Sequence, residues 1–203
     1  YGRGADHEFR DFMGQNLFLA DLTELPGLDN LLAPEGPIKT AQELAGTLYG
    51  ADRSYFLVNG STVGVLAMVI STVRTGEYII VPRDSHISVI GALILSGAIP
   101  ICVEPRIEKA FGVLLGPDAR DISRVIESHP EARAVLITRP NYYGVVPDLE
   151  KVAALAKNCD KIVMVDEAHG AHWGFHEGLP RGALRLGAEL VVQSLHKMGG
   201  SLT

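Results

Sequence analysis

The most informative part of the chain lies near its end, where it reads Val191-Val192-Gln193-Ser194-Leu195-His196-Lys197-Met198-Gly199-Gly200. Its apolar start predicts a short buried strand, and the polar turn after it presents one lysine ahead of two glycines. A lysine held just past a strand end can be partly desolvated and still reach a carbonyl, which suits a Schiff base. Most lysines are solvated surface groups, so an ordinary surface position is the competing interpretation of Lys197.

A second strand signal lies upstream, where Lys161-Ile162-Val163-Met164-Val165 runs into Asp166-Glu167-Ala168-His169-Gly170. A carboxylate at a strand end can keep a pyridine nitrogen protonated, and a lysine nearby can hold the aldehyde of the same ring. The two strand ends together therefore predict a pyridoxal 5'-phosphate (PLP) site, with Asp166 on the pyridinium nitrogen and Lys197 on the aldehyde. A helix N-cap or a buried ion pair is the competing interpretation of Asp166.

Strand and helix signals alternate along the chain. Strands are predicted at 54–58, 78–82, 99–103, 134–138, 162–166 and 189–193, and helices at 40–49, 62–73, 86–95, 118–128, 148–157 and 180–186. The strands are continuous apolar runs such as Tyr78-Ile79-Ile80-Val81, which is typical of strands buried on both faces of a parallel sheet. The sequence therefore predicts an α/β fold with three layers, α/β/α, around a mostly parallel sheet.

The domain organisation follows from the same pattern. Residues 1–38 lack clean periodicity and read as an N-terminal arm with turns, whereas 39–203 read as a cofactor-binding large domain, with a loop at 104–117. The chain begins with Tyr1 and stops six residues past Lys197. We therefore expect a partial large domain whose sheet is incomplete at the C-terminus.

Composition narrows the function classes. Hydrophobic residues make up 47% and charged residues 21% of the 203 residues, which predicts a globular chain. A net charge of -6 without a basic run argues against nucleic acid as a partner. No apolar stretch reaches the roughly 18–20 residues of a membrane span. Only two cysteines occur, Cys102 and Cys159, which favours a reduced, cytoplasmic location over a disulfide framework.

Polar clusters follow five of the predicted strands, and the carboxyl ends of parallel strands are where such sheets bind ligands. These clusters are 59–62, 83–86, 139–142, 166–169 and 194–197. Ser61 and Thr62 open a helix whose N-terminal N–H groups suit a phosphate, although either hydroxyl could simply cap that helix. His86 follows Ser85, a candidate N-cap, and either stacks on the cofactor ring or is a half-exposed histidine of the first turn.

Two further functions share some of these residues. Asp166-Glu167-Ala168-His169 spells the DEAH sequence of helicase-type ATPases, but that activity also needs a phosphate loop with Gly-Lys, and no Gly-Lys pair occurs in the chain. His169, His172 and His176, with Glu167 and Glu177, have the residue types of a metal site, but Gly170, Gly174 and Gly178 disfavour the regular helix that would align them. We therefore predict no metal.

With these motifs placed, the chain resembles the major domain of the Orn/Lys/Arg decarboxylases, PLP enzymes of fold type I (aspartate-aminotransferase-like). The resemblance covers essentially the whole chain. It rests on six ordered motifs, at residues 21–29, 56–62, 82–86, 140–144, 166–172 and 193–197, and the last of these, Gln193-Ser194-Leu195-His196-Lys197, contains the Ser-x-His-Lys signature of cofactor attachment in that family.

The resemblance implies a role for each site residue. Lys197 would carry the Schiff base, Asp166 would pair with the pyridinium, and His86 and Ala168 would pack on the two ring faces, with His169 beside the cofactor. Ser61, Thr62, Ser194 and His196 would hold the phosphate. The implied reaction is decarboxylation of a basic amino acid (arginine, lysine or ornithine, with arginine preferred) to its amine, with His86 or Lys197 as the proton donor.

The resemblance also implies a homodimer or higher homo-oligomer, with residues of both subunits in the active site, so we expect the 203 residues alone to be inactive. The main competing function is another fold-type-I activity, an aminotransferase or a carbon–sulfur lyase. The sequence also leaves open a DEAH-type ATPase and a catalytically inactive fragment.

Overall fold

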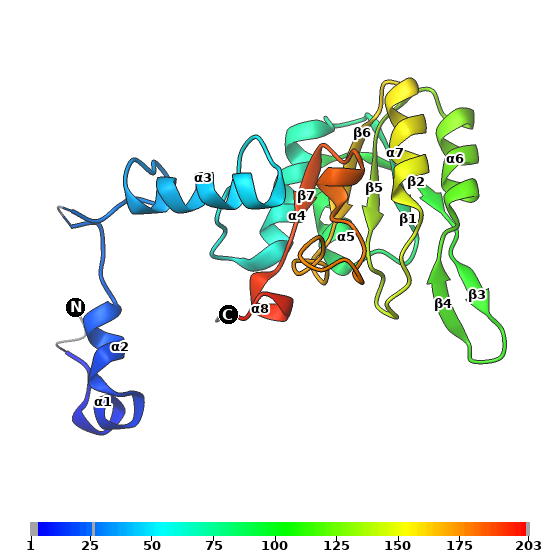
Figure 1. Ribbon diagram of the computed structural model, residues 1–203. Coiled ribbons are helices and arrows are strands. Elements are labelled where there is room, and N and C mark those ends of the chain that lie inside the picture. Colours follow the sequence, from blue (N-terminus) through cyan, green and yellow to red (C-terminus); the bar gives the residue numbers. More distant parts are fainter. Residues whose placement is uncertain (1–3, 26, 202–203) are drawn as a thin grey trace. The chain divides into compact units, whose positions relative to one another are not determined.

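The computed structural model describes residues 4–25 and 27–201 (Figure 1). Contacts divide the chain into two compact units, residues 1–56 and 57–203. Pro26, which belongs to the first family motif, lies outside the described residues. The division that the sequence suggests at residue 38 stays a prediction.

The first unit contains three helices among its described residues: α1 (His7–Met13), α2 (Gln15–Ala20) and α3 (Pro37–Tyr49). One carboxylate organises the start of α3, because Asp29 accepts backbone N–H bonds from residues 30, 35, 36, 38 and 39 at 2.8–3.2 Å. These bonds hold the pKa of Asp29 well below its ordinary value, against the opposing effect of desolvation. Helix α3 thus begins three residues before the predicted start, and it ends at Gly50 in the left-handed region.

The second unit is built on a five-stranded sheet of order β2-β1-β5-β6-β7, in which every pairing is parallel. Its strands are β1 (Tyr78–Pro82), β2 (Ile99–Val103), β5 (Ala132–Thr138), β6 (Ile162–Asp166) and β7 (Leu190–Val192). Five of the six predicted strands are confirmed here, and they are the continuous apolar runs of the sequence.

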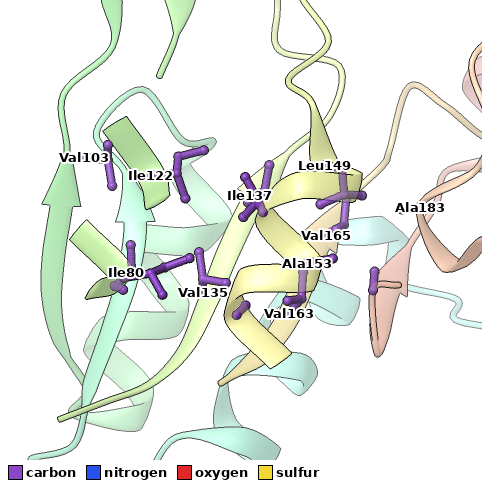
Figure 2. Close-up of a cluster of buried hydrophobic side chains, with 14 of the residues drawn as sticks. Ile80, Val103, Ile122, Val135, Ile137, Leu149, Ala153, Val163, Val165 and Ala183 are labelled. Carbon is purple, nitrogen blue, oxygen red and sulfur yellow. The ribbon is translucent and has the colours of Figure 1, made fainter. Parts of the chain in front are cut away.

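Helices cover both faces of this sheet. The helices α4 (Gly60–Thr72) and α5 (Ile87–Ser96) pack with Ile79, Leu136 and Met164 on one face. The helices α6 (Ala119–Ser128) and α7 (Leu149–Asn158) pack with Val135 and Val163 on the other face, which Figure 2 shows. Successive residues of one strand thus lie in different cores, as strand geometry requires. The predicted three-layer α/β/α architecture is confirmed.

Three sequence predictions of local structure are wrong. Residues 54–58 form no strand, because no described strand hydrogen-bonds to them. The expected loop at 104–117 contains an antiparallel hairpin of β3 (Arg106–Glu108) and β4 (Val113–Gly116), whose strands are only three and four residues long and of which β3 is exposed and mostly charged. The helix expected at 180–186 is a single 3-10 turn, η1 (Ala183–Leu186), because Pro180 and Gly182 disfavour a longer helix.

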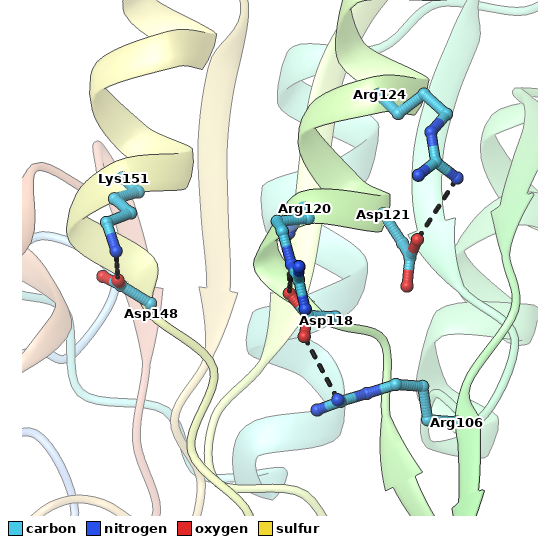
Figure 3. Close-up of polar contacts among 7 residues, drawn as sticks. All are labelled: Arg106, Asp118, Arg120, Asp121, Arg124, Asp148 and Lys151. Carbon is cyan, nitrogen blue, oxygen red and sulfur yellow. Dashed lines mark hydrogen bonds and ion pairs between the residues drawn. The ribbon is translucent and has the colours of Figure 1, made fainter.

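The polar contacts at the starts of α6 and α7 lie at the surface, where Asp118 is partly exposed and Lys151 is exposed (Figure 3). Asp118 caps α6 through the Arg120 N–H at 2.9 Å and lies 3.2 Å from Arg106, whereas Asp148 lies 2.8 Å from Lys151 at the start of α7. Exposed ion pairs contribute little to stability because water screens them. These residues are therefore suitable control positions for substitutions in the site. No helix in the described part of the chain is long and apolar enough for a bilayer crossing.

Lys161 is a buried cation at the amino end of β6, with 2% of its surface exposed. Its Nζ donates to the carbonyl oxygens of His129 at 2.7 Å, Ala132 at 2.9 Å and Pro130 at 3.3 Å. These carbonyls belong to the turn that leads from α6 into β5, so one ammonium group fixes that turn to the sheet. The strand pattern places Lys161 beside the apolar run but predicts no role for it.

We expect Lys161→Met to lower the free energy of unfolding by roughly 2–4 kcal/mol, because methionine keeps the apolar stem but leaves buried carbonyls without a donor. Urea denaturation of the purified protein measures this. The matched control is Lys157→Met, at an exposed position near the end of α7. Equal stability of the two variants would contradict the assigned role of Lys161.

Candidate active site

The carboxyl ends of β6 and β7 bring the two decisive sequence motifs together. Asp166 is the last residue of β6, and Lys197 lies in α8 (Leu195–Met198), which follows β7 after two residues. Strand register places Asp166 opposite Thr138 of β5 and Val192 of β7. The motifs are separated by 31 residues in sequence (197 − 166 = 31), but parallel pairing places both at the ligand-binding edge of the sheet.

Asp166 is a buried carboxylate, with 6% of its surface exposed. Its Oδ1 accepts one described hydrogen bond, from the backbone N–H of Ala168 at 3.1 Å. Burial raises its pKa above the ordinary value, against the opposing effects of the Ala168 hydrogen bond and of the charges of His86, Lys197 and His169. Such a carboxylate has acceptor capacity left for a cationic N–H group.

Lys197 and His169 are in direct contact. The Lys197 Nζ lies 3.2 Å from Nε2 of His169, and both residues are exposed. Burial, and then the charge of Lys197, lowers the pKa of His169, which favours its neutral imidazole. A neutral Nε2 can accept a hydrogen bond from the amine of Lys197.

His86 caps α5 rather than lying in its first turn. Its Nδ1 accepts from the Ser88 N–H at 3.2 Å and lies 2.8 Å from the Ser88 hydroxyl, which fixes the ring at the end of β1. The prediction that Ser85 is the N-cap is wrong, because the Ser85 hydroxyl donates to the Pro82 carbonyl at 2.7 Å. The imidazole is exposed and is near enough to Asp166 to affect its pKa.

The residues that the sequence predicts to bind a phosphate lie at the starts of two helices, α4 and α8. Helix α4 begins after Asn59 and has no side-chain cap, so the interpretation of Ser61 or Thr62 as the helix cap is wrong. The first N–H groups of the helix can therefore bind an anion. Ser194 is 3% exposed, and its hydroxyl has no hydrogen-bond partner among the residues that the structure describes. His196 is exposed in α8. No described contact joins Ser61 or Thr62 to Ser194 or His196; α4 does pack on β7, where Gly64 leaves room for Val192.

The residues of a metal site or a DEAH-type ATPase are placed differently. Within residues 4–25 and 27–201, no three His, Cys, Asp or Glu side chains come together as a metal ion would require. Glu167, which both functions need at the site, is fully buried and paired with Arg139 at 2.9 Å. His176 accepts from the Gly178 N–H in an exposed loop. These groups therefore do not form a shared ligand set.

The sequence prediction missed a buried network below the site. Arg139 and Gln193 belong to polar segments at strand ends and Glu167 to the competing motifs, yet all three meet beneath the strand ends. The sequence could have predicted on which face two of them lie. Arg139 and Glu167 continue the alternation of the strand residues that face α6 and α7.

Solved structures show the class of protein that has this fold. The constitutive lysine decarboxylase of Escherichia coli matches with a TM-score of 0.78 and 24% identity over 97% of this chain and 29% of that one. Serine palmitoyltransferase of Sphingomonas wittichii matches with a TM-score of 0.63 and 21% identity over 81% of this chain and 40% of that one. The chain has the fold of the type I PLP enzymes.

The particular family follows from the sequence. The profile "Orn/Lys/Arg decarboxylase, major domain" matches residues 2–203, and the chain belongs to this family. The arginine decarboxylase of Bacillus subtilis (strain 168) is 42% identical over 202 residues, which cover 100% of this chain and 41% of the relative. The chain thus spans less than half the length of this curated relative. The family resemblance inferred from the six motifs is confirmed.

Proposed function

We propose that this chain forms the cofactor-binding part of a PLP-dependent decarboxylase that acts on a basic amino acid. The observation that carries the proposal is the contact of Lys197 with His169 beside the buried Asp166. Family membership supports decarboxylation, and the relative named arginine decarboxylase favours arginine over lysine or ornithine. A homo-oligomer in the cytoplasm is part of the same proposal.

The residues present fit PLP. The buried Asp166 has one described N–H donor and no described cationic partner at hydrogen-bond distance, so it suits the pyridinium nitrogen. The Ser194 hydroxyl is buried without a described partner, and the first turn of α4 has no side-chain cap, so both suit the phosphate, with Ser61, Thr62 and His196. Lys197 would hold the aldehyde, and His86 and Ala168 would contact the ring faces.

Bound PLP supplies an electron sink for the electron pair that remains when the α-carboxylate leaves as carbon dioxide. Asp166 keeps a proton on the ring nitrogen, which makes that sink effective. Neutral His169 accepts a hydrogen bond from Lys197 and can take its proton, which leaves a nucleophilic amine. His86 or Lys197 then delivers the proton that replaces carbon dioxide at Cα.

The test is borohydride reduction of the full-length protein with added PLP, followed by digestion and mass spectrometry. We expect a pyridoxyl adduct on the peptide that contains Lys197, because reduction fixes a lysine-bound cofactor covalently. No adduct on folded full-length protein would overturn the proposal. An adduct without carbon dioxide release from arginine, lysine or ornithine would favour an aminotransferase or a carbon–sulfur lyase instead.

A further inference from the structure

Glu167 is a fully buried carboxylate directly after Asp166, and the proposed reaction gives it no role. Its Oε1 accepts from Arg139 Nη1 at 2.9 Å and from the Ala183 N–H at 3.0 Å, and its Oε2 accepts from Gln193 Nε2 at 2.8 Å. Three described donors therefore hold both oxygens of a side chain that is fully buried.

The two adjacent carboxylates serve opposite faces of the sheet. Met164 packs with α4 and α5, and two residues later Asp166 ends the strand on that face. Val163 and Val165 pack with α6, α7 and Ala183, and Glu167 continues their side by bonding the Ala183 N–H. Arg139 follows Ile137 on this second face in the same way.

The network joins the ends of three neighbouring strands. Arg139 follows β5, Glu167 follows β6 and Gln193 follows β7. Backbone bonds run alongside the side-chain contacts, because the Arg139 N–H donates to the Asp166 carbonyl and the Glu167 N–H donates to the Val192 carbonyl, each at 2.9 Å. Any shift of Glu167 therefore moves Asp166 and the start of the Ser194–Lys197 segment together.

Packing around the ion pair is tight. The Arg139 guanidinium lies 4.6 Å from the centre of the Trp173 ring, as in a cation–π contact. A Cβ added at Gly170 would come within 2.5 Å of Glu167 Cγ and 2.9 Å of the Trp173 ring. The carboxylate is thus held by contacts on its stem as well as by bonds to its oxygens.

Stability alone does not account for this arrangement. Burial raises the pKa of Glu167 and lowers that of Arg139, and in each case the partner opposes the shift. Replacing a buried ion pair by apolar residues of similar volume is often neutral or stabilising, because both charges lose their hydration. A pair retained beneath a reactive site therefore points to a geometric role.

We propose that Glu167, paired with Arg139 and Gln193, is a positioning residue that fixes Asp166 relative to the Lys197 segment. The inference rests on the proposed PLP site, which Glu167 itself does not touch. Its effect on the cofactor passes through the backbone of Asp166 and the end of β7.

The test compares PLP binding by the full-length wild type, Glu167→Gln and Arg139→Met/Glu167→Met. The single variant keeps the shape but leaves Arg139 without its counter-charge, and the double variant removes both charges so that the protein stays folded. We expect PLP affinity, titrated by visible absorbance, to fall roughly 10- to 100-fold in both, as for other residues that orient a binding group without touching the ligand. Glu150→Gln, at an exposed glutamate of α7, is the matched control.

A second readout separates positioning from loss of folding. When Asp166 holds the ring nitrogen less well, the ring carries less positive charge, so the pH midpoint of the visible band of lysine-bound PLP should move upward in both variants. A double variant that melts like the wild type and also binds PLP with unchanged affinity and midpoint would overturn the inference. Absence of the Lys197 adduct in the wild type would instead overturn the proposed function, and the positioning role with it.

Discussion

Lys197→Ala is expected to lower kcat/KM of the full-length protein for its basic amino acid by at least about 10³-fold, because alanine removes the amine that forms the covalent link. The borohydride adduct should disappear with the activity. Lys197→Arg should fail as well, since guanidinium stays protonated and cannot act as a nucleophile. Release of carbon dioxide from labelled substrate measures the loss.

The matched control is Lys151→Ala, which removes an exposed lysine at the start of α7 (Figure 3). It should retain wild-type activity and the Lys197 adduct. If Lys197→Ala kept more than about a tenth of the activity, Lys197 would be the surface lysine of the competing interpretation.

Asp166→Asn is expected to lower kcat/KM by on the order of 10²- to 10⁴-fold, because the amide keeps the size of the side chain but cannot hold a proton on the ring nitrogen. PLP affinity should weaken too, since a buried carboxylate would no longer face the cationic ring. Asp160→Asn, in the turn after α7, is the control. Wild-type activity of Asp166→Asn would place the ring nitrogen elsewhere.

The pH dependence of Asp166 has a defined sign. Its folded pKa is raised above 3.8 by burial, so its contribution to stability is present below that value and is lost as pH rises through the raised pKa. Bound PLP would offset this loss of stability, because its ring nitrogen would pair with the ionised carboxylate of Asp166. The increase in Tm on adding PLP should therefore grow with pH over this window, and Asp166→Asn should flatten the trend.

Much of the sheet can be predicted from the sequence, because Tyr78-Ile79-Ile80-Val81 and similar runs are apolar on both faces and admit few other environments. For the segment at 54–58, the same apolar pattern leads to a wrong prediction of a strand. Its apolar residues satisfy the strand pattern, but a strand also requires a neighbour that hydrogen-bonds to it, and pairing is not a local property. The hairpin of β3 and β4 is not predicted because β3 is three exposed residues with two charges, and the short apolar run of β4 ends at a glycine that suggests a loop.

In the candidate site, the predicted ends of two parallel strands are enough to place Asp166 and Lys197 at the same edge of the sheet. The contact between Lys197 and His169 depends on the path of the chain after β6, which glycines and turns determine. The sequence places the cap of α5 one residue too early because Ser85 and His86 can both accept a backbone N–H. The role of Glu167 could not be predicted, because the Asp-Glu-Ala-His sequence suggests a side chain that faces an exposed ligand site. In the structure its partners Arg139 and Gln193 lie below the strand ends.

The alternation at the end of β6 has a consequence for changes in chain length. Inserting one residue within Ile162–Asp166 would move Asp166 into the place of Glu167 beside Arg139, and deleting one residue would move Glu167 into the place of Asp166 at the other face. Neither side chain has the right length for the other position. Variants of this protein should therefore accept insertions in the exposed loop between β3 and β4 far more readily than any indel in β6.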